Sequence, residues 1–210
     1  MHETRLTFLA AAAEARSALV HADVEARWDE PSALAEMTIG ELAAHLARAV
    51  ITVQSYLGNP VSKTEEPMSA VSYYAAMEGL SDVASPLNAG VRKRAAEGAR
   101  DGCHAVIESF DASLAELRHT LTTEPDDRLV EMLGNRVLPV DECLLSRVLE
   151  LTIHTDDLWV SIGRPTPALT GMQPTIRLLV DIAEMRHGEL AVLRALCRRE
   201  RDPGDVLRVL

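Results

Sequence analysis

This 210-residue chain has few aromatic residues and an excess of negative charge, and both features exclude classes of partner. Phe, Trp and Tyr together make up 3% of the residues, so the aromatic platforms on which single-stranded nucleic acids stack are not expected. The formal net charge of −11 disfavours contact with a phosphate backbone. We therefore expect no nucleic-acid partner, and we interpret the short basic clusters at residues 92–94 and 198–199 as solvated helix faces.

Long apolar runs and paired cysteines are also missing. No segment reaches the ~20 uninterrupted apolar residues of a membrane-spanning helix, and residues 1–5, MHETR, lack the pattern of a secretory signal. We expect a cytoplasmic protein with no membrane partner. The three cysteines, Cys103, Cys143 and Cys197, show no CxxC spacing, which disfavours a thiolate-rich structural zinc site and suits a reducing compartment.

The spacing of apolar residues predicts an all-α fold, an up-down four-helix bundle with a long crossover loop and additional C-terminal helices. Hydrophobic residues make up 47% of the chain, enough to bury a substantial core. A helical period predicts four long helices, over residues 4–26, 39–57, 91–121 and a last one that Asp141 caps and that ends near Gly163.

The connections between these helices carry most of the proline and glycine. The crossover up to residue 90 is predicted to hold one short helix at residues 69–78, and residues 123–139 a loop with a short hairpin. Two further helices are expected at residues 173–187 and 189–199. We divide the chain into a bundle over residues 1–165 and a helical extension over residues 166–210, packed on the bundle or used in a homodimer.

Two ionisable residues lie among apolar neighbours in the last of these helices. Glu150 and His154 are four residues apart and fall about 40° apart around a helix, and Asp157 extends the same stripe. A buried carboxylate needs a partner, and a divalent cation shared with a neutral imidazole is a suitable one. The alternative is a solvent-facing stripe on which Glu150 and His154 form an ordinary i,i+4 pair.

A third candidate ligand is His45, in the helix that Thr38 and Glu41 open with a capping box. His45 lies two turns inside that helix, at the border of its apolar face. An isolated histidine there is often only a structural residue, so the pattern leaves both roles open. Cys143 also falls on the Glu150 stripe, where a small buried hydrophobe is the better interpretation.

Three segments of the chain carry a family resemblance: residues 28–34 with 37–47 (MTIGELAAHLA), residues 147–158 (RVLELTIHTDDL) and residues 186–201. These segments resemble the mycothiol-dependent maleylpyruvate isomerase N-terminal-domain family, which is similar to the DinB-like metal-binding bundles. The specific part is the combined pattern of a histidine followed by ExxxH. The resemblance spans most of the chain.

The resemblance implies a metal held by His45, Glu150 and His154, with one position open for water or substrate, as in a catalytic zinc site. Zinc suits these ligands, and nickel, iron or manganese accept similar sets. Asp157 is implied as a residue that supports a ligand or contacts substrate, with a helix-end charge as the alternative.

The implied activity is that of a mycothiol-dependent transferase or isomerase, in which the metal holds a small-molecule thiol as a thiolate that attacks an electrophilic substrate. Two alternatives stay open: a hydrolase that uses metal-bound water, and a non-catalytic metal-binding or interaction protein. The isomerase proper also carries a C-terminal αβ domain, and we expect no strands after residue 165.

Overall fold

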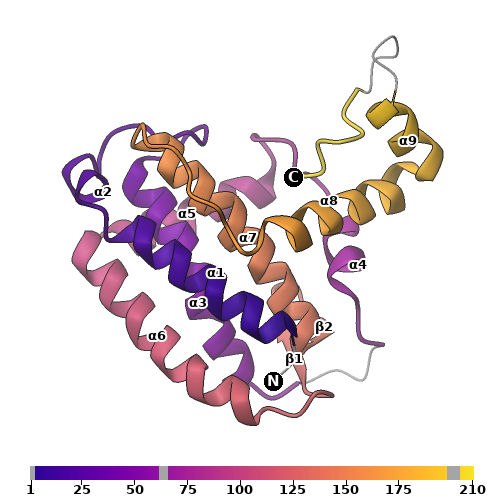
Figure 1. Ribbon diagram of the computed structural model, residues 1–210, viewed down its shortest axis with the longest axis horizontal. Coiled ribbons are helices and arrows are strands. Elements are labelled where there is room, and N and C mark those ends of the chain that lie inside the picture. The colour runs from indigo at the N-terminus through magenta and orange to yellow at the C-terminus, as the bar shows by residue number, and fades with distance from the viewer. Residues whose placement is uncertain (1–2, 62–65, 198–203) are drawn as a thin grey trace.

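The computed structural model describes residues 3–61, 66–197 and 204–210 and shows a bundle of long helices beside a small two-stranded sheet (Figure 1). The elements follow in the order α1 (Glu3–Leu19), α2 (Ala22–Ala26), α3 (Ile39–Gly58), α4 (Ala70–Ala75), α5 (Pro86–Ala99), α6 (Cys103–Thr123), β1 (Leu129–Met132), β2 (Arg136–Pro139), α7 (Val140–Ser161), α8 (Met172–His187) and α9 (Glu189–Cys197).

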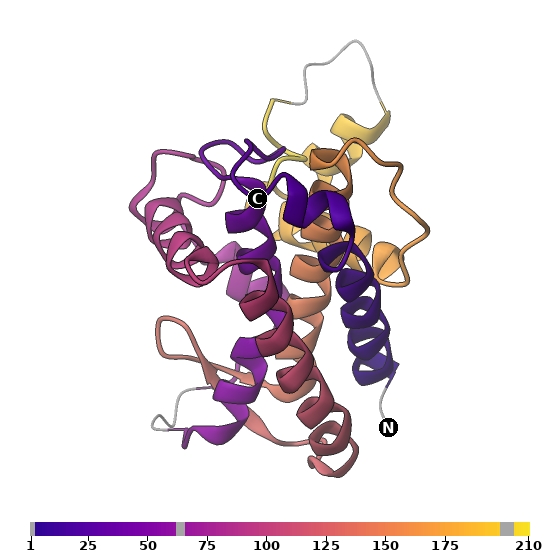
Figure 2. The same cartoon turned by 90° about the vertical axis from the view of Figure 1, so that its left-hand side faces the viewer.

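Four long helices, α1, α3, α6 and α7, pack together as the bundle. The view in Figure 2 shows them running along the same axis, with α5 beside the upper part of α3. Their facing sides bury large apolar side chains, among them Phe8, Leu42, Phe110 and Leu144, each with 0% exposure. Burial of these apolar surfaces drives the association of the helices, and the predicted all-α bundle is confirmed.

Two predicted helices are interrupted, and two residues explain the breaks. The predicted helix over residues 4–26 is wrong as one element, because α1 ends at Leu19 and the His21 side chain caps the separate helix α2. The predicted helix over residues 91–121 is also two helices, because Gly102 has φ +84° between α5 and α6. Only glycine adopts that conformation at little cost.

The start of α7 differs from the prediction by a few residues. Asp141 was expected to cap this helix, but the helix begins at Val140 with Pro139 before it. Asp141 lies in the first turn, where its carboxylate accepts a hydrogen bond from Nε of Arg5 at 2.9 Å. The negative charge still stabilises the helix N-terminus through the helix dipole.

Two local signals in the sequence are confirmed, the capping box at Thr38 and the hairpin within residues 123–139. The capping box is confirmed, with Thr38 accepting from the amide of Glu41 and Glu41 accepting from the amide of Thr38. The predicted hairpin is the antiparallel pair β1 and β2, and Gly134 and Asn135 turn it with positive φ. Trp28 packs over Gly40, so closely that a Cβ there would overlap its indole ring.

The two C-terminal helices lie on one side of the bundle, where α8 starts beside the middle of α7 (Figure 1). Helix α8 packs against α4 and α7, and α9 packs against α8 (Figure 1). Residues 198 and 199 of the predicted last helix lie outside the described residues. The division at residue 165 and the homodimer stay predictions. Across residues 3–61, 66–197 and 204–210, no helix is both long and apolar enough to cross a membrane.

Candidate metal centre

Helices α3 and α7 bring His45, Glu150 and His154 together. The two imidazole Nε2 atoms lie 3.2 Å apart, Nε2 of His154 lies 3.2 Å from Oε2 of Glu150, and Nε2 of His45 lies 3.8 Å from the same oxygen. All three side chains are largely buried, with exposures of 16–21%. The solvent-facing i,i+4 pair is therefore not the arrangement seen.

These separations suit a shared metal ion. A tetrahedral metal with bonds of ~2.1 Å holds its ligand atoms roughly 3.4 Å apart, and the three atoms that face one another here are separated by 3.2 to 3.8 Å. Two imidazoles and one carboxylate leave one tetrahedral position without a protein ligand. The residues fit a divalent metal of the catalytic kind, and metal binding itself stays a prediction.

Asp157 acts on the far side of His154. Its Oδ2 lies 2.9 Å from Nδ1 of His154, so that a proton on Nδ1 is donated to the carboxylate and the lone pair of Nε2 is directed toward Glu150 and His45. A carboxylate that orients a ligating histidine in this way also raises the basicity of the imidazole. The geometry agrees with the supporting role of Asp157, and its part in catalysis stays a prediction.

Tyr74 from α4 positions the carboxylate of Glu150. Its hydroxyl donates to Oε1 of Glu150 at 2.7 Å and also lies 3.2 Å from the carbonyl oxygen of Ser146. Burial and the charge of Glu150 raise the pKa of Tyr74 well above its ordinary value, so the hydroxyl stays a donor. With Oε1 engaged, Oε2 is the oxygen that faces the two histidines.

The electrostatics of the three candidate ligands differ. Burial lowers the pKa of His45 to about 3, helped by the charge of His154, so this imidazole is neutral. Burial alone would lower the pKa of His154, but hydrogen bonds to Asp157 and Glu150 raise it to about 9. Burial would raise the pKa of Glu150, yet His154, Arg147 and His45 together hold it below its ordinary value.

These pKa values predict a pH dependence of metal affinity. At pH 7 the metal-free protein carries a proton on His154, whose pKa is about 9, and a metal at Nε2 must displace it. We expect the affinity to rise about tenfold per pH unit from pH 7 to 9 and then to level off. Competition with a chelator of known pH dependence measures this, and an affinity independent of pH in that range would contradict it.

Tyr74→Phe tests whether the hydroxyl positions Glu150. The variant keeps the buried ring and loses only the donor to Oε1, so we expect metal affinity to fall about 10- to 100-fold, as when other supporting hydrogen bonds at metal sites are removed. Tyr73→Phe is the matched control, because its ring is also buried and lies beside Tyr74. Equal losses in both variants would show a packing effect instead.

The three candidate ligands line a cavity of about 450 Å³. All three tyrosines of the chain also line it, although aromatic residues are scarce. Arg48, Arg94 and Arg147 line the same cavity, and the charge of Arg147 acts on Glu150. Within the described part of the chain, no carboxylate forms an ion pair with Arg48 or Arg94, and burial and the neighbouring arginines lower the pKa of Arg48.

The sequence pattern indicated the three candidate ligands that the structure brings together, and it gave no assignment for other residues that line the cavity. Arg147 shares the α7 stripe at i−3 from Glu150, so helical spacing could have assigned it to the site. The concentration of rare tyrosines gave a weaker signal for Tyr74. Cys143 is buried, and burial raises its pKa to about 11. It lies outside the described group of possible ligands, in agreement with a structural role.

Comparisons with known proteins agree with this geometry. The family model for the mycothiol maleylpyruvate isomerase N-terminal domain matches residues 9–159. A crystal structure of the mycothiol-dependent maleylpyruvate isomerase is similar, with a TM-score of 0.53 and 22% identity over 85% of this chain and 67% of that one. A histidine-to-alanine mutant of that enzyme gives a TM-score of 0.54 and 21% identity over the same shares of the two chains.

No protein with a curated description matches the chain significantly. The two solved structures, each below 25% identity, support the fold alone. The family model spans most of the chain and includes α3, most of α7 and all three candidate ligands. The chain therefore belongs to the mycothiol maleylpyruvate isomerase N-terminal domain family.

Proposed function

We propose that this protein binds a divalent metal, with zinc the first candidate, and is a mycothiol-dependent transferase or isomerase. The observation that carries the proposal is the convergence of His45, Glu150 and His154 on the wall of a cavity. A bound metal would supply an open position at which a small-molecule thiol loses its proton and becomes a strong nucleophile near neutral pH. We place the protein in the cytoplasm, which agrees with its free cysteines.

The residues around the candidate ligands hold the ligand atoms in an arrangement that suits a metal. Asp157 orients His154, and Tyr74 orients Glu150. The buried Arg147 lies close to Glu150 and helps to keep that group a carboxylate. Each supporting contact reduces the reorganisation that metal binding requires, because the ligand atoms already face one another.

The charge of the cavity indicates an anionic electrophile. Arg48 and Arg94 line the cavity without an ion-pairing carboxylate from the described residues, and like charges at short range are costly unless an anion joins them. A carboxylate on the substrate would accept hydrogen bonds from the N–H groups of both arginines, which would hold the substrate beside the thiol. We therefore propose a substrate that carries both an electrophilic carbon and at least one negative charge.

Calorimetry and a thiol-dependence assay test the proposed function together. Zinc-loaded protein is titrated with mycothiol, and consumption of a panel of anionic electrophiles is followed with and without the thiol. We expect binding of mycothiol and turnover only in its presence. Turnover without thiol would favour the hydrolase, and full metal occupancy with neither thiol affinity nor turnover would favour the non-catalytic protein; either result contradicts the proposal.

A further inference from the structure

The segment of residues 204–210, here called the strap, folds back onto the body of the protein. Val209 within it is 2% exposed and belongs to the hydrophobic core, and Val206 packs against that core. Leu207 and Leu210 are more exposed, at 43% and 37%. The strap is thus anchored through its valines, while its two leucines line cavities.

Arg186 on α8 holds the strap in place. Its Nη1 donates to the carbonyl oxygen of Val209 at 2.6 Å, and its Nη2 donates to the carbonyl oxygens of Tyr74 and Met77 at 2.6 and 2.9 Å. One guanidinium therefore joins the strap to the end of α4, the helix that supplies the Tyr74 hydroxyl to Glu150. Hydrogen bonds from a charged donor are stronger than neutral ones.

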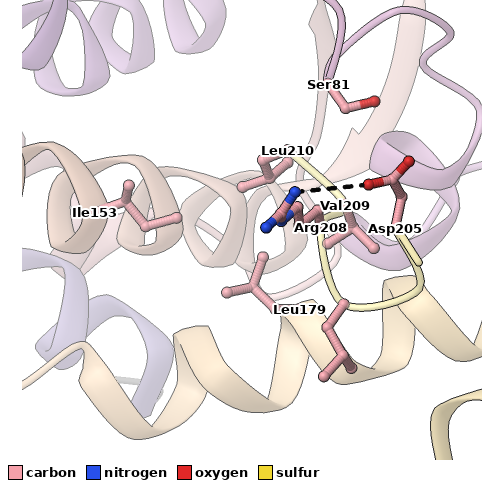
Figure 3. Close-up of a pocket in the computed structure, with 8 residues that line it drawn as sticks. Ser81, Ile153, Leu179, Asp205, Arg208, Val209 and Leu210 are labelled. Atoms are coloured by element: carbon pink, nitrogen blue, oxygen red, sulfur yellow. Dashed lines mark ion pairs between the residues drawn. The ribbon is translucent and has the colours of Figure 1, made fainter. Parts of the chain in front are cut away.

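Two cavities meet at the strap, because Leu210 lines both of them. Besides the metal cavity there is a neighbouring cavity of about 360 Å³, lined by both ends of the strap together with Ser81 and Leu179. Figure 3 shows the Leu210 side chain at the end of the strap, on the side of α7, the helix that carries Ile153. Among the described residues, Ile153 and Leu210 line both cavities, and Ile153 directly precedes His154 in the chain.

We propose that Leu210 is a specificity-determining residue that limits the size of the ligand at the metal. Its side chain forms part of the partition between the two cavities, so a ligand larger than the metal cavity must either displace the strap or replace that side chain. Arg186 is the positioning residue that keeps the strap closed. The partition rests on the metal binding that we propose above, but it would act on any ligand of that metal and does not depend on the proposed use of a thiol.

Two metal ligands of different size test the partition without a thiol. Cobalt-loaded protein is titrated with imidazole and with 4-phenylimidazole, followed by the visible absorption of the cobalt. In Leu210→Ala we expect the affinity for 4-phenylimidazole to rise about tenfold relative to the affinity for imidazole. This factor corresponds to the burial of roughly half a phenyl ring in the space that the leucine side chain leaves. Leu207→Ala is the matched control, because Leu207 lies on the same strap and lines the neighbouring cavity but not the metal cavity.

The outcomes separate the proposals. A changed size preference in Leu210→Ala but not in Leu207→Ala supports the partition, whether or not mycothiol binds. An unchanged preference in Leu210→Ala, or the same change in both variants, overturns it. Failure of mycothiol to bind cobalt-loaded protein that does bind imidazole contradicts the proposed function and leaves the partition intact.

Arg186→Met tests, in the metal-free protein, whether Arg186 holds the strap in place. Loss of the three hydrogen bonds is expected to speed hydrogen exchange at least tenfold in residues 206–210, whose Arg208 amide donates to Asp205. In the cobalt-loaded protein the same variant should shift the size preference in the direction of Leu210→Ala. Unchanged exchange in a variant whose helical content is intact would overturn the role of Arg186.

Discussion

Replacing His154 with alanine is expected to lower metal affinity about 100- to 1,000-fold. Metal binding contributes roughly 10–16 kcal/mol in structural zinc sites of four ligands, so one ligand accounts for about 2.5–4 kcal/mol, or roughly 10²- to 10³-fold. The loss should be large because His154 is the central residue of the site: its Nε2 lies 3.2 Å from both other candidate ligands, and its Nδ1 faces Asp157.

Elemental analysis of purified protein beside a competition titration measures this effect. His45→Ala and Glu150→Ala are expected to lose metal in the same way, and each variant is checked for helical content. His119→Ala is the matched control, since His119 is exposed on α6 and lies outside the described group of possible ligands. If all three ligand variants retained stoichiometric metal, the candidate metal centre would be wrong.

Arg5→Ala is expected to destabilise the protein by about 3–5 kcal/mol, the range for removing one partner of a buried charged network. Arg5 is 2% exposed, and its guanidinium donates to Asp141 and to the carbonyl oxygens of Leu121, Glu124 and Pro125. It joins the start of α1 to the end of α6 and the start of α7. The substitution leaves three carbonyl oxygens without this donor and opens a cavity.

Thermal and chemical denaturation measure this change. For a chain of this length, 3–5 kcal/mol corresponds to a fall in Tm of roughly 6–20 °C. Arg16→Ala is the control on the same helix: its ion pair with Asp111 joins side chains that are 45% and 37% exposed, so solvent screening leaves a loss of about 0–1 kcal/mol. Similar losses in both variants would show that burial of Arg5 is not the cause.

Signals contained within a few neighbouring residues were predictable from the sequence. The capping box at Thr38 and Glu41 depends on residues three apart, and it starts α3 where expected. The spacing of Glu150, His154 and Asp157 places them on one face of any helix, whatever surrounds it. The breaks at His21 and Gly102 were not predicted because apolar periodicity continues across each of them.

The environment of the site could not be predicted in the same way. Tyr74 reaches Glu150 across 76 positions of sequence, and Arg186 joins Val209 to the end of α4. Neither pair shares a helical face or a spacing rule, because such contacts depend on how separate elements pack. The arginines of the cavity depend on packing in the same way. Arg94 belongs to a basic cluster that was interpreted as a solvated helix face, and only the packing of α3 and α5 shows that Arg48 and Arg94 line one cavity.

The sequence by itself determined the helical class, the site-bearing stripe of α7 and the candidate ligand set, since each depends on local periodicity or on a family pattern. The tertiary structure decided the rest. It brought His45 to within 3.2 Å of His154 from a helix 109 positions away, supplied the tyrosine that orients Glu150, and placed the strap against the cavity. Local propensities act over a few residues, whereas these contacts form only when buried apolar surfaces fix the helices against one another.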